Sequence, residues 1–305
     1  DDYFGGERDI LRAGSCSVAY TSVSVLKSIA ENVPFYIPEE LLELEAVRES
    51  AVEDFLPRLR ETSGERPPFI YTHGFNISFD RGCRRASELQ RSLGLGGRFV
   101  LFSWPSDGVI VNYTQDETDL YWSVEALQKT LADMIEEFGT GKVNVIAHSL
   151  GTRGTMLALV RLSIEHESVK KSSAGNQMFD QLVLLAADTD AGIFEQYLPY
   201  IKPLAKRITI YVSSYDSPLA ASENLHGYPR LGQSGSHLKG LEGVEIIDVS
   251  DVPVQYPSGH LYHLYNRAVI DDLNQLLNGN KAAAERKHLK KDADNYWRLQ
   301  PGDDI

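Results

Sequence analysis

Residues 143–154, VNVIAHSLGTRG, contain a serine at the point where a predicted strand ends and a predicted helix begins. The apolar run before Ser149 is typical of a buried strand, and the residues after it continue at helical spacing. Ala147 and Gly151 lie two positions to either side of Ser149, and both are small enough for a tight strand-to-helix turn. The segment is an Ala-for-Gly variant of the G-x-S-x-G nucleophile elbow. Since a plain helix N-cap would suit the same residues, the interpretation needs partners elsewhere in the chain.

The alternation of strands and helices around this segment predicts an α/β fold. From residue 67 onward, short apolar runs alternate with amphipathic stretches. The predicted strands are 68–75, 98–105, 142–149, 179–188, 207–214 and 244–249. The predicted helices are 81–95, 117–138, 150–164, 192–204, 218–225 and 261–277. Continuous apolar strands separated by helices indicate a mostly parallel sheet with helices on both faces.

Residues 66–280 are expected to form this α/β domain, with an additional segment at either end. The segment 1–65 is predicted to contain a strand at 17–26 and a helix at 38–60, which pack on the core or cap it. The segment 281–305 is charged and is expected to be a solvated helix or extension. Three of its side chains would allow it to dock on the domain: Tyr296, Trp297 and Leu299.

The composition describes a globular chain with an acidic balance. It has 305 residues, a net charge of −13 and 42% hydrophobic residues. The negative charge argues against nucleic-acid binding, and no apolar run approaches the roughly 18 residues of a membrane span. Cys16 and Cys83 are too few for a disulfide framework. A single bridge between them is possible but not required, and Cys83 is expected to be a small packing residue.

The sequence implies no cofactor and no metal. It contains no Walker-type loop, no GxGxxG after a strand and no metal-ligand spacing. The chain opens with DDYFGGERD, without Met or an apolar leader. A cytoplasmic location is favoured. A secreted or periplasmic location is the alternative if a leader was removed.

The segment 72–76, THGFN, follows the first of these strands and has the features of an oxyanion hole. Acyl transfer needs N–H donors aimed at the developing oxyanion. The N–H groups of Phe75 and Leu150 are the candidates, because Gly74 allows the loop to turn closely. His73 is expected to brace the loop through side-chain hydrogen bonds. A glycine-bearing loop with a purely structural histidine is the alternative.

A candidate acid follows the next-to-last strand of this domain. Asp216, in YVSSYDSP, lies a few residues beyond the strand, where a carboxylate can hold an imidazole in the correct tautomer. Asp188 and Asp190 follow the preceding strand and remain competitors. Either of these two could instead cap the next helix.

A candidate base is expected late in the chain, since the order in this arrangement is serine, acid, histidine. That order leaves five residues: His226, His237, His260, His263 and His288. His260, in PSGHLYHLY, lies at a loop-to-helix junction and is the predicted base. His263 lies away from the apolar face of the predicted helix and is expected to be solvated.

Residues next to these groups are expected to line the substrate site: His73, Gly74, Trp104 and His148. Core packing is an equal alternative for Trp104, in FSWPSDG. His148 adjoins the serine but lies on the wrong side of the turn to serve as its base. For Arg230, a structural salt bridge is favoured over contact with a substrate carboxylate.

Taken in order, several motifs resemble a bacterial family of alpha/beta hydrolases known as a domain of unknown function, number nine hundred. They are FIYTHGFNISFDRG, VLFSWPSDG, VNVIAHSLGTR, LLAADTD, YVSSYDSPLAAS and GHLYHLYNRAVIDDL. The resemblance covers about residues 67–277 and leaves 1–65 unmatched. It implies an α/β-hydrolase fold in which Ser149 is the nucleophile, Asp216 the acid and His260 the base. The family has no settled substrate.

These features together predict a serine hydrolase that cleaves carboxylic esters through an acyl-enzyme, with a small-molecule ester as its partner. Short- or medium-chain esters are favoured, because no apolar lid is evident. Acyl transfer or amide cleavage would use the same three residues. A non-catalytic binding protein on the same fold is a further alternative. The sequence does not indicate the oligomeric state.

Overall fold

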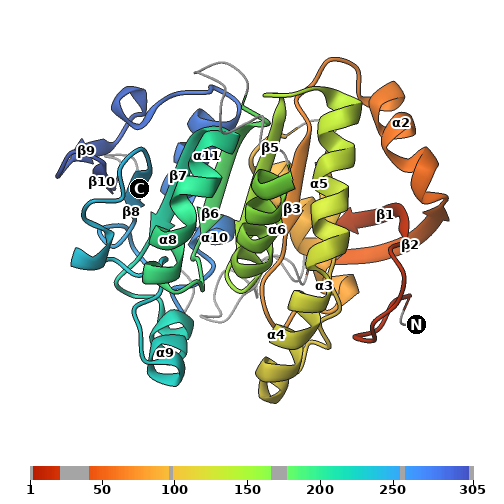
Figure 1. Ribbon diagram of the computed structural model, residues 1–305, viewed down its shortest axis with the longest axis horizontal. Coiled ribbons are helices and arrows are strands. Elements are labelled where there is room, and N and C mark those ends of the chain that lie inside the picture. Colours follow the sequence, from red (N-terminus) through yellow and green to blue (C-terminus); the bar gives the residue numbers. More distant parts are fainter. Residues whose placement is uncertain (1–2, 21–40, 96–98, 166–176, 255–257, 302–305) are drawn as a thin grey trace.

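The computed structural model describes residues 3–20, 41–95, 99–165, 177–254 and 258–301. Its centre is an eight-stranded sheet with the order β4-β3-β5-β6-β7-β8-β10-β9 (Figure 1). Neighbouring strands are parallel except for β9 and β10. The strands are β3 (Phe69–Thr72), β4 (Phe99–Phe102), β5 (Val143–His148), β6 (Phe179–Leu185), β7 (Ala205–Val212), β8 (Glu245–Asp248), β9 (Leu289–Lys291) and β10 (Tyr296–Leu299).

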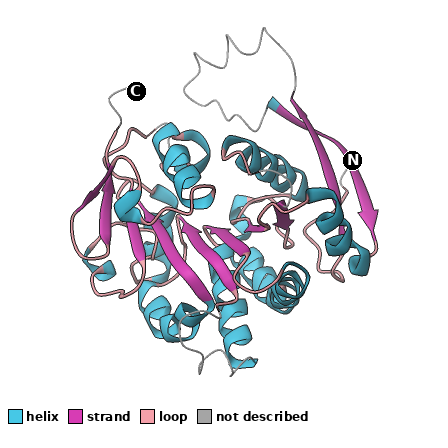
Figure 2. Ribbon diagram, turned by 90° about the horizontal axis from the view of Figure 1, so that it is seen from above, coloured by secondary structure: helices cyan, strands magenta, loops and turns pink. Residues whose placement is uncertain are grey.

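Helices cover both faces of this sheet (Figure 2). One face carries α5 (Val124–Phe138), α6 (Gly151–Glu165) and α8 (Ala191–Ile201). The other face carries α3 (Phe79–Ser92), α10 (Tyr262–Tyr265) and α11 (Arg267–Leu277). Along β3, Ile70 packs into the first of these cores, whereas Phe69 and Tyr71 pack into the second. The α/β architecture predicted from the apolar strands is therefore confirmed.

Two further helices flank the edge of the sheet where the parallel strands end. They are α4 (Tyr113–Trp122) and α9 (Ser217–His226), which lie at the bottom of Figure 1. Ligands of open α/β sheets bind beyond this edge. Short 3₁₀ turns lie at Ile110–Asn112, Lys202–Leu204, Ser236–Leu238 and Ala283–Glu285.

The N-terminal segment contains an antiparallel hairpin followed by a helix. The hairpin joins β1 (Ala13–Tyr20) to β2 (Leu42–Ser50), and α2 (Val52–Ser63) follows. The predicted helix at 38–60 is therefore wrong over residues 42–50. Leu42 and Leu44 alternate with acidic residues, and pairing with β1 overrides the helical spacing. Residues 21–26 of the predicted strand and 38–40 of the predicted helix lie outside the described residues.

A disulfide joins this hairpin to the main domain. Cys16 on β1 is bonded to Cys83 on α3, with their Cα atoms 6.2 Å apart. The prediction that Cys83 is only a packing residue is therefore wrong. The disulfide can form only because the hairpin lies against α3. A second contact between them is the hydrogen bond that the Tyr20 hydroxyl on β1 donates to Glu88 on α3, at 2.6 Å.

Two of the predicted helices are each divided into two. The predicted helix 117–138 lies across α4 and α5, which meet at Ser123. The hydroxyl of Ser123 donates to the Asp119 carbonyl, at 2.8 Å. The predicted helix 261–277 is α10 followed by α11, and the side chain of Asn266 caps α11 by accepting from the Val269 N–H.

The C-terminal segment completes the sheet and is not a solvated extension. Its strand β10 pairs in parallel with β8, and β9 pairs with β10. Tyr296 and Leu299 are buried, as their predicted docking requires, and the Tyr296 hydroxyl donates to Asp248 at 2.6 Å. Within the described ranges, none of the helices is both long and apolar enough to cross a bilayer.

Candidate active site

Ser149 lies on a tight turn between β5 and α6, at the edge of the sheet where the parallel strands end. Its φ of 51° is in the left-handed region, which residues with a side chain seldom adopt. A Cβ on Gly151 would lie 2.2 Å from the His73 carbonyl oxygen. The turn can therefore form only with glycine at 151, because the loop after β3 passes directly over it.

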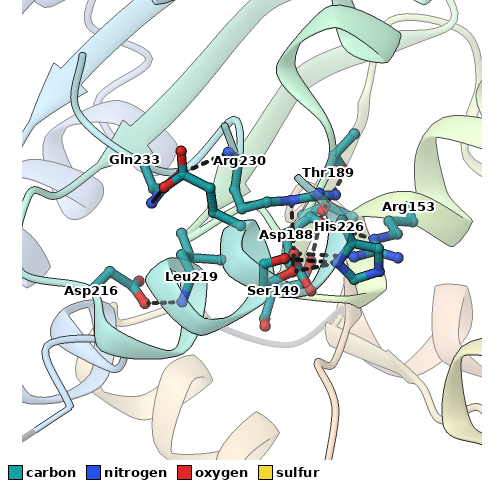
Figure 3. Close-up of polar contacts among 12 residues, drawn as sticks. Ser149, Arg153, Asp188, Thr189, Asp216, Leu219, His226, Arg230 and Gln233 are labelled. Carbon is teal, nitrogen blue, oxygen red and sulfur yellow. Dashed lines mark hydrogen bonds and ion pairs between the residues drawn. The ribbon is translucent and has the colours of Figure 1, made fainter. Parts of the chain in front are cut away.

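Asp216 and His260 form a hydrogen-bonded pair near this turn. The Nδ1 atom of His260 lies 2.9 and 2.7 Å from the two carboxylate oxygens of Asp216. A proton held on Nδ1 by this carboxylate leaves Nε2 as the basic nitrogen. Asp216 also accepts a hydrogen bond from the Leu219 N–H at the start of α9 (Figure 3). The carboxylate is therefore held in place by both the helix and the imidazole.

Gly259 allows His260 to approach this carboxylate. Its φ is +65°, and a Cβ there would lie 2.0 Å from the Tyr215 carbonyl oxygen. The Ser258 carbonyl also accepts a hydrogen bond from the Ser217 N–H, at 2.9 Å. The loop before α10 is thus fastened to the loop after β7. This contact brings together an acid and an imidazole that are 44 residues apart in the sequence.

The His260 ring lies beside the residue that precedes the serine. Its centroid is 4.8 Å from that of the His148 ring. Ser149 and His260 are only 7% and 8% exposed, and no direct hydrogen bond joins them among the described residues. Hydrogen bonds of catalytic groups are often long before a substrate binds.

The loop after β3 passes directly against Ser149. A Cβ on Gly74 would lie 2.8 Å from the Ser149 Cβ and 3.0 Å from Nδ1 of His148. Only glycine allows the loop to approach this closely. Neither the Phe75 N–H nor the Leu150 N–H donates to an acceptor within the described part of the chain. Both N–H groups are therefore without an acceptor in that part of the chain.

The side chains of His73 and Trp104 help to hold the loop after β3 in place. Their rings are stacked with centroids 4.9 Å apart, and the Trp104 Nε1–H donates to the His73 carbonyl at 2.9 Å. His73 also contacts the Gly74 carbonyl and the Ser103 hydroxyl through its two ring nitrogens. Burial lowers the pKa of His73 to about 4, so the ring is neutral at pH 7. Both side chains are buried, and Trp104 packs within the apolar core.

His148 and His263 form a second buried contact beside the site. The two ring centroids are 4.4 Å apart, and His263 is 0% exposed. The expectation that His263 is solvated is therefore wrong. The expectation assumed one continuous helix, whereas α10 ends at Tyr265 and Asn266 is extended before α11 begins. Burial lowers the pKa of both histidines well below the usual value, and their neighbouring imidazoles act in the same direction.

Asp188 lies next to Ser149, and several residues contact its carboxylate (Figure 3). Its carboxylate pairs with Arg153 at 3.2 Å and Arg230 at 3.1 Å. It also accepts hydrogen bonds from the hydroxyls of Tyr113 and Ser222, at 2.7 and 2.6 Å. The salt bridge favoured for Arg230 is present. Asp188 therefore connects α4, α6 and α9 around the site, a role that its sequence context did not reveal.

The remaining acid and base candidates have other partners. Asp190 accepts from the Ile193 N–H and caps α8. His226 contacts the Ser222 carbonyl, and His237 contacts the Arg230 carbonyl. Of the five candidate histidines, all of which the structure describes, only His260 contacts Asp216.

Comparisons with known proteins find similarities over parts of the chain. An uncharacterized protein from Nostoc sp. strain PCC 7120 is 28% identical in an alignment of 149 positions that covers 41% of this chain and 39% of that protein. The chain thus spans well under half the length of this relative. Among solved structures, an esterase of Pyrobaculum calidifontis is 13% identical with a TM-score of 0.40, covering 71% of this chain and 78% of its own. Esterase B of Lactobacillus rhamnosis is also 13% identical, with a TM-score of 0.35 and coverages of 73% and 81%.

The sequence pattern of one family covers most of the chain. Residues 48–280 match the family described as alpha/beta hydrolase of unknown function (DUF900). The match includes the turn at Ser149, the loop after β3 and the pair formed by Asp216 and His260. The chain therefore belongs to this family of alpha/beta hydrolases and has the α/β-hydrolase fold.

Proposed function

We propose that this hydrolase is a serine esterase with Ser149 as nucleophile, His260 as general base and Asp216 as the acid. The contact of His260 Nδ1 with both oxygens of Asp216 carries the proposal, because it prepares Nε2 to accept a proton. A serine hydroxyl is a weak nucleophile at neutral pH and needs such a base. The left-handed backbone at Ser149 supports the assignment, since strained residues gather at functional sites.

The reaction would proceed through an acyl-enzyme. His260 accepts the proton of Ser149 as the serine oxygen attacks the ester carbonyl. The N–H groups of Phe75 and Leu150 stabilise the resulting oxyanion. His260 then returns the proton to the leaving alcohol, and a water activated by the same histidine hydrolyses the acyl-enzyme. Gly74, His73 and Trp104 hold the oxyanion loop against the serine.

Labelling with a fluorophosphonate probe tests the nucleophile. The parent protein should be labelled, and labelling should disappear in Ser149→Ala but persist in Ser163→Ala, which removes a buried hydroxyl from α6 without touching the turn. Equal labelling of parent and Ser149→Ala would disprove the proposal.

A series of p-nitrophenyl esters of increasing chain length tests the reaction class and the size of the acyl site. His260→Ala should lower kcat/KM by roughly 10³-fold or more, because the three residues act as a unit. His237→Ala, which alters a histidine bonded to the Arg230 carbonyl, is the matched control and should stay within a few fold of the parent. A loss below tenfold in His260→Ala would mean that another group is the base.

A further inference from the structure

A cavity of about 430 Å³ lies between the N-terminal hairpin and the main domain. Residues of β1, β2, α2, α3, β4 and α5 line it, and neither Ser149 nor His260 is among them. The hairpin stands at one end of the large sheet, beside α2 (Figure 2). The volume falls within the range of about 300–1,000 Å³ that is typical of small-molecule sites. The cavity is therefore a candidate ligand site separate from the proposed active site.

The walls of this cavity are largely apolar and come from several elements. They include Phe55 and Leu59 of α2, Phe79 and Ala86 of α3, Leu101 of β4 and Ala126 of α5. Apolar walls held apart lose dispersion contacts that an apolar occupant would restore. The disulfide between Cys16 and Cys83 lies in the wall and fastens the hairpin to α3. A pocket fixed in this way loses little freedom when a ligand binds.

The charged residues of the lining disfavour an anion. They are four carboxylates and one arginine: Glu7, Asp9, Glu49, Asp133 and Arg12. Arg12 is already paired with Glu49 at 3.2 Å and Asp9 at 3.8 Å. The positive charge is therefore compensated, and the remaining carboxylates would repel a carboxylate or phosphate head group.

We propose that this cavity binds the alkyl chain of an uncharged single-chain lipid. The apolar walls accommodate the chain, and the acidic lining selects a neutral head group over an anionic one. Trp104 separates the cavity from His73, so the bound chain contacts the residue that supports the oxyanion loop. The site goes beyond the proposed esterase reaction and does not require it, because Ser149 takes no part in binding.

Binding is tested on the full chain carrying Ser149→Ala, with decan-1-ol as the neutral probe and decanoate as its charged counterpart. Trp104 and Trp122 both line the cavity, so intrinsic tryptophan fluorescence is expected to change on binding. Decan-1-ol should saturate a single site below its solubility limit. Decanoate at pH 8 should bind at least tenfold more weakly. Equal affinities for the two probes, or no saturable binding of decan-1-ol, would overturn the proposal.

Two variants on α5 locate the site. Ala126 lines the cavity and Ala132 does not, although both are partly buried on the same helix. Ala126→Phe should weaken decan-1-ol binding at least tenfold, and Ala132→Phe should leave it within threefold of the parent. Ser87→Leu, which narrows the cavity from α3, provides a second test if Ala126→Phe does not fold. Unchanged decan-1-ol binding in a folded cavity variant would contradict the assignment. Fluorophosphonate labelling of the parent protein tests the role of Ser149 independently.

Discussion

Ser149 adopts a backbone conformation that its surroundings must impose. Its N–H donates to the Leu185 carbonyl at 3.0 Å, and its carbonyl accepts from the Asp188 N–H at 3.2 Å and the Thr152 hydroxyl at 2.7 Å. These bonds hold the residue in the left-handed region, at an energetic cost of about 1–3 kcal/mol. The side chain is thereby directed out of the packed layers, toward the loop of Gly74.

The two buried aspartates next to this turn should respond differently to the same substitution. Asp216→Asn should lower kcat by roughly 10³-fold or more with little loss of stability, because it removes the partner of His260. Asp188→Asn should instead lower the free energy of unfolding by about 3 kcal/mol, because Arg153 and Arg230 lose a buried counter-charge. Ester hydrolysis and urea unfolding measure the two effects. A larger kcat loss in a folded Asp188→Asn would reassign the acid.

The buried neutral histidines should make the fold sensitive to acid. The pKa of His73 is about 4 in the folded protein and about 6.5 when unfolded, so between these values the unfolded chain binds more protons. Stability is fully present above about pH 6.5 and is lost as the pH falls. The loss attributable to His73 at pH 4.5 should be roughly 2–3 kcal/mol.

Urea unfolding at pH 7.5 and pH 4.5 measures this dependence. His73→Gln should reduce the difference between the two pH values by that amount, whatever its effect on stability at pH 7.5. His237→Gln, measured at the same two pH values, is the control for removing a histidine outside the core. A pH difference that is unchanged in His73→Gln would contradict the assignment of His73 as a neutral buried histidine.

At the scale of elements, helices α4 and α9 are joined across the site by Asp188. Tyr113 begins α4 and Ser222 lies on α9, and both donate to this carboxylate. The rings of Tyr113 and His226 also meet, with centroids 5.9 Å apart. The two helices are therefore held at a fixed separation beside Ser149.

The disulfide between β1 and α3 should stabilise the hairpin against the domain. It closes a loop with a sequence separation of 67 residues, and bonds of this kind contribute about 2–4 kcal/mol. Dithiothreitol should therefore lower the Tm of the parent, and the Cys16→Ser/Cys83→Ser double variant should unfold at the lower temperature with or without reductant. Titration of two free thiols in the unfolded, unreduced parent would show that the bond is absent.

At the scale of the whole molecule, the two ends of the chain extend the domain in opposite directions. The hairpin stands at the β4 end of the sheet, and the C-terminal strands add to β8 at the other end (Figure 2). The matched family region ends at residue 280, so β9 and β10 lie beyond it. Arg286 connects this C-terminal addition to the core through Asp272 and the Tyr211 hydroxyl, at 2.7 and 3.0 Å.

Arg286→Ala should lower the free energy of unfolding by about 3–5 kcal/mol, because it leaves the buried Asp272 carboxylate without its cation. Arg298→Ala, which alters a cation that is 40% exposed, should cost less than 1 kcal/mol. Urea unfolding compares the two variants. Equal small losses would mean that the C-terminal strands contribute little to the fold.

Local patterns accounted for the central sheet and part of the site. Apolar runs predicted β3 to β8, and small residues around Ser149 predicted the turn before α6. Chain order and turn residues predicted that Asp216 and His260 would act together, and the structure has them in contact. Their catalytic role stays a prediction. The roles of Phe75 and Leu150 and the substrate contacts expected for His73, Gly74, Trp104 and His148 also stay predictions.

The sequence by itself determined the α/β architecture and the order of its chemical groups, because strand, helix and turn signals depend on residues close in the chain. Tertiary structure alone decided that residues 42–50 form a strand, that Cys83 is bonded to Cys16, and that β10 pairs with β8. It also decided that His263 is buried and that Asp188 lies between two arginines. Each of these outcomes depends on a partner distant in sequence, which periodicity and local propensity do not identify.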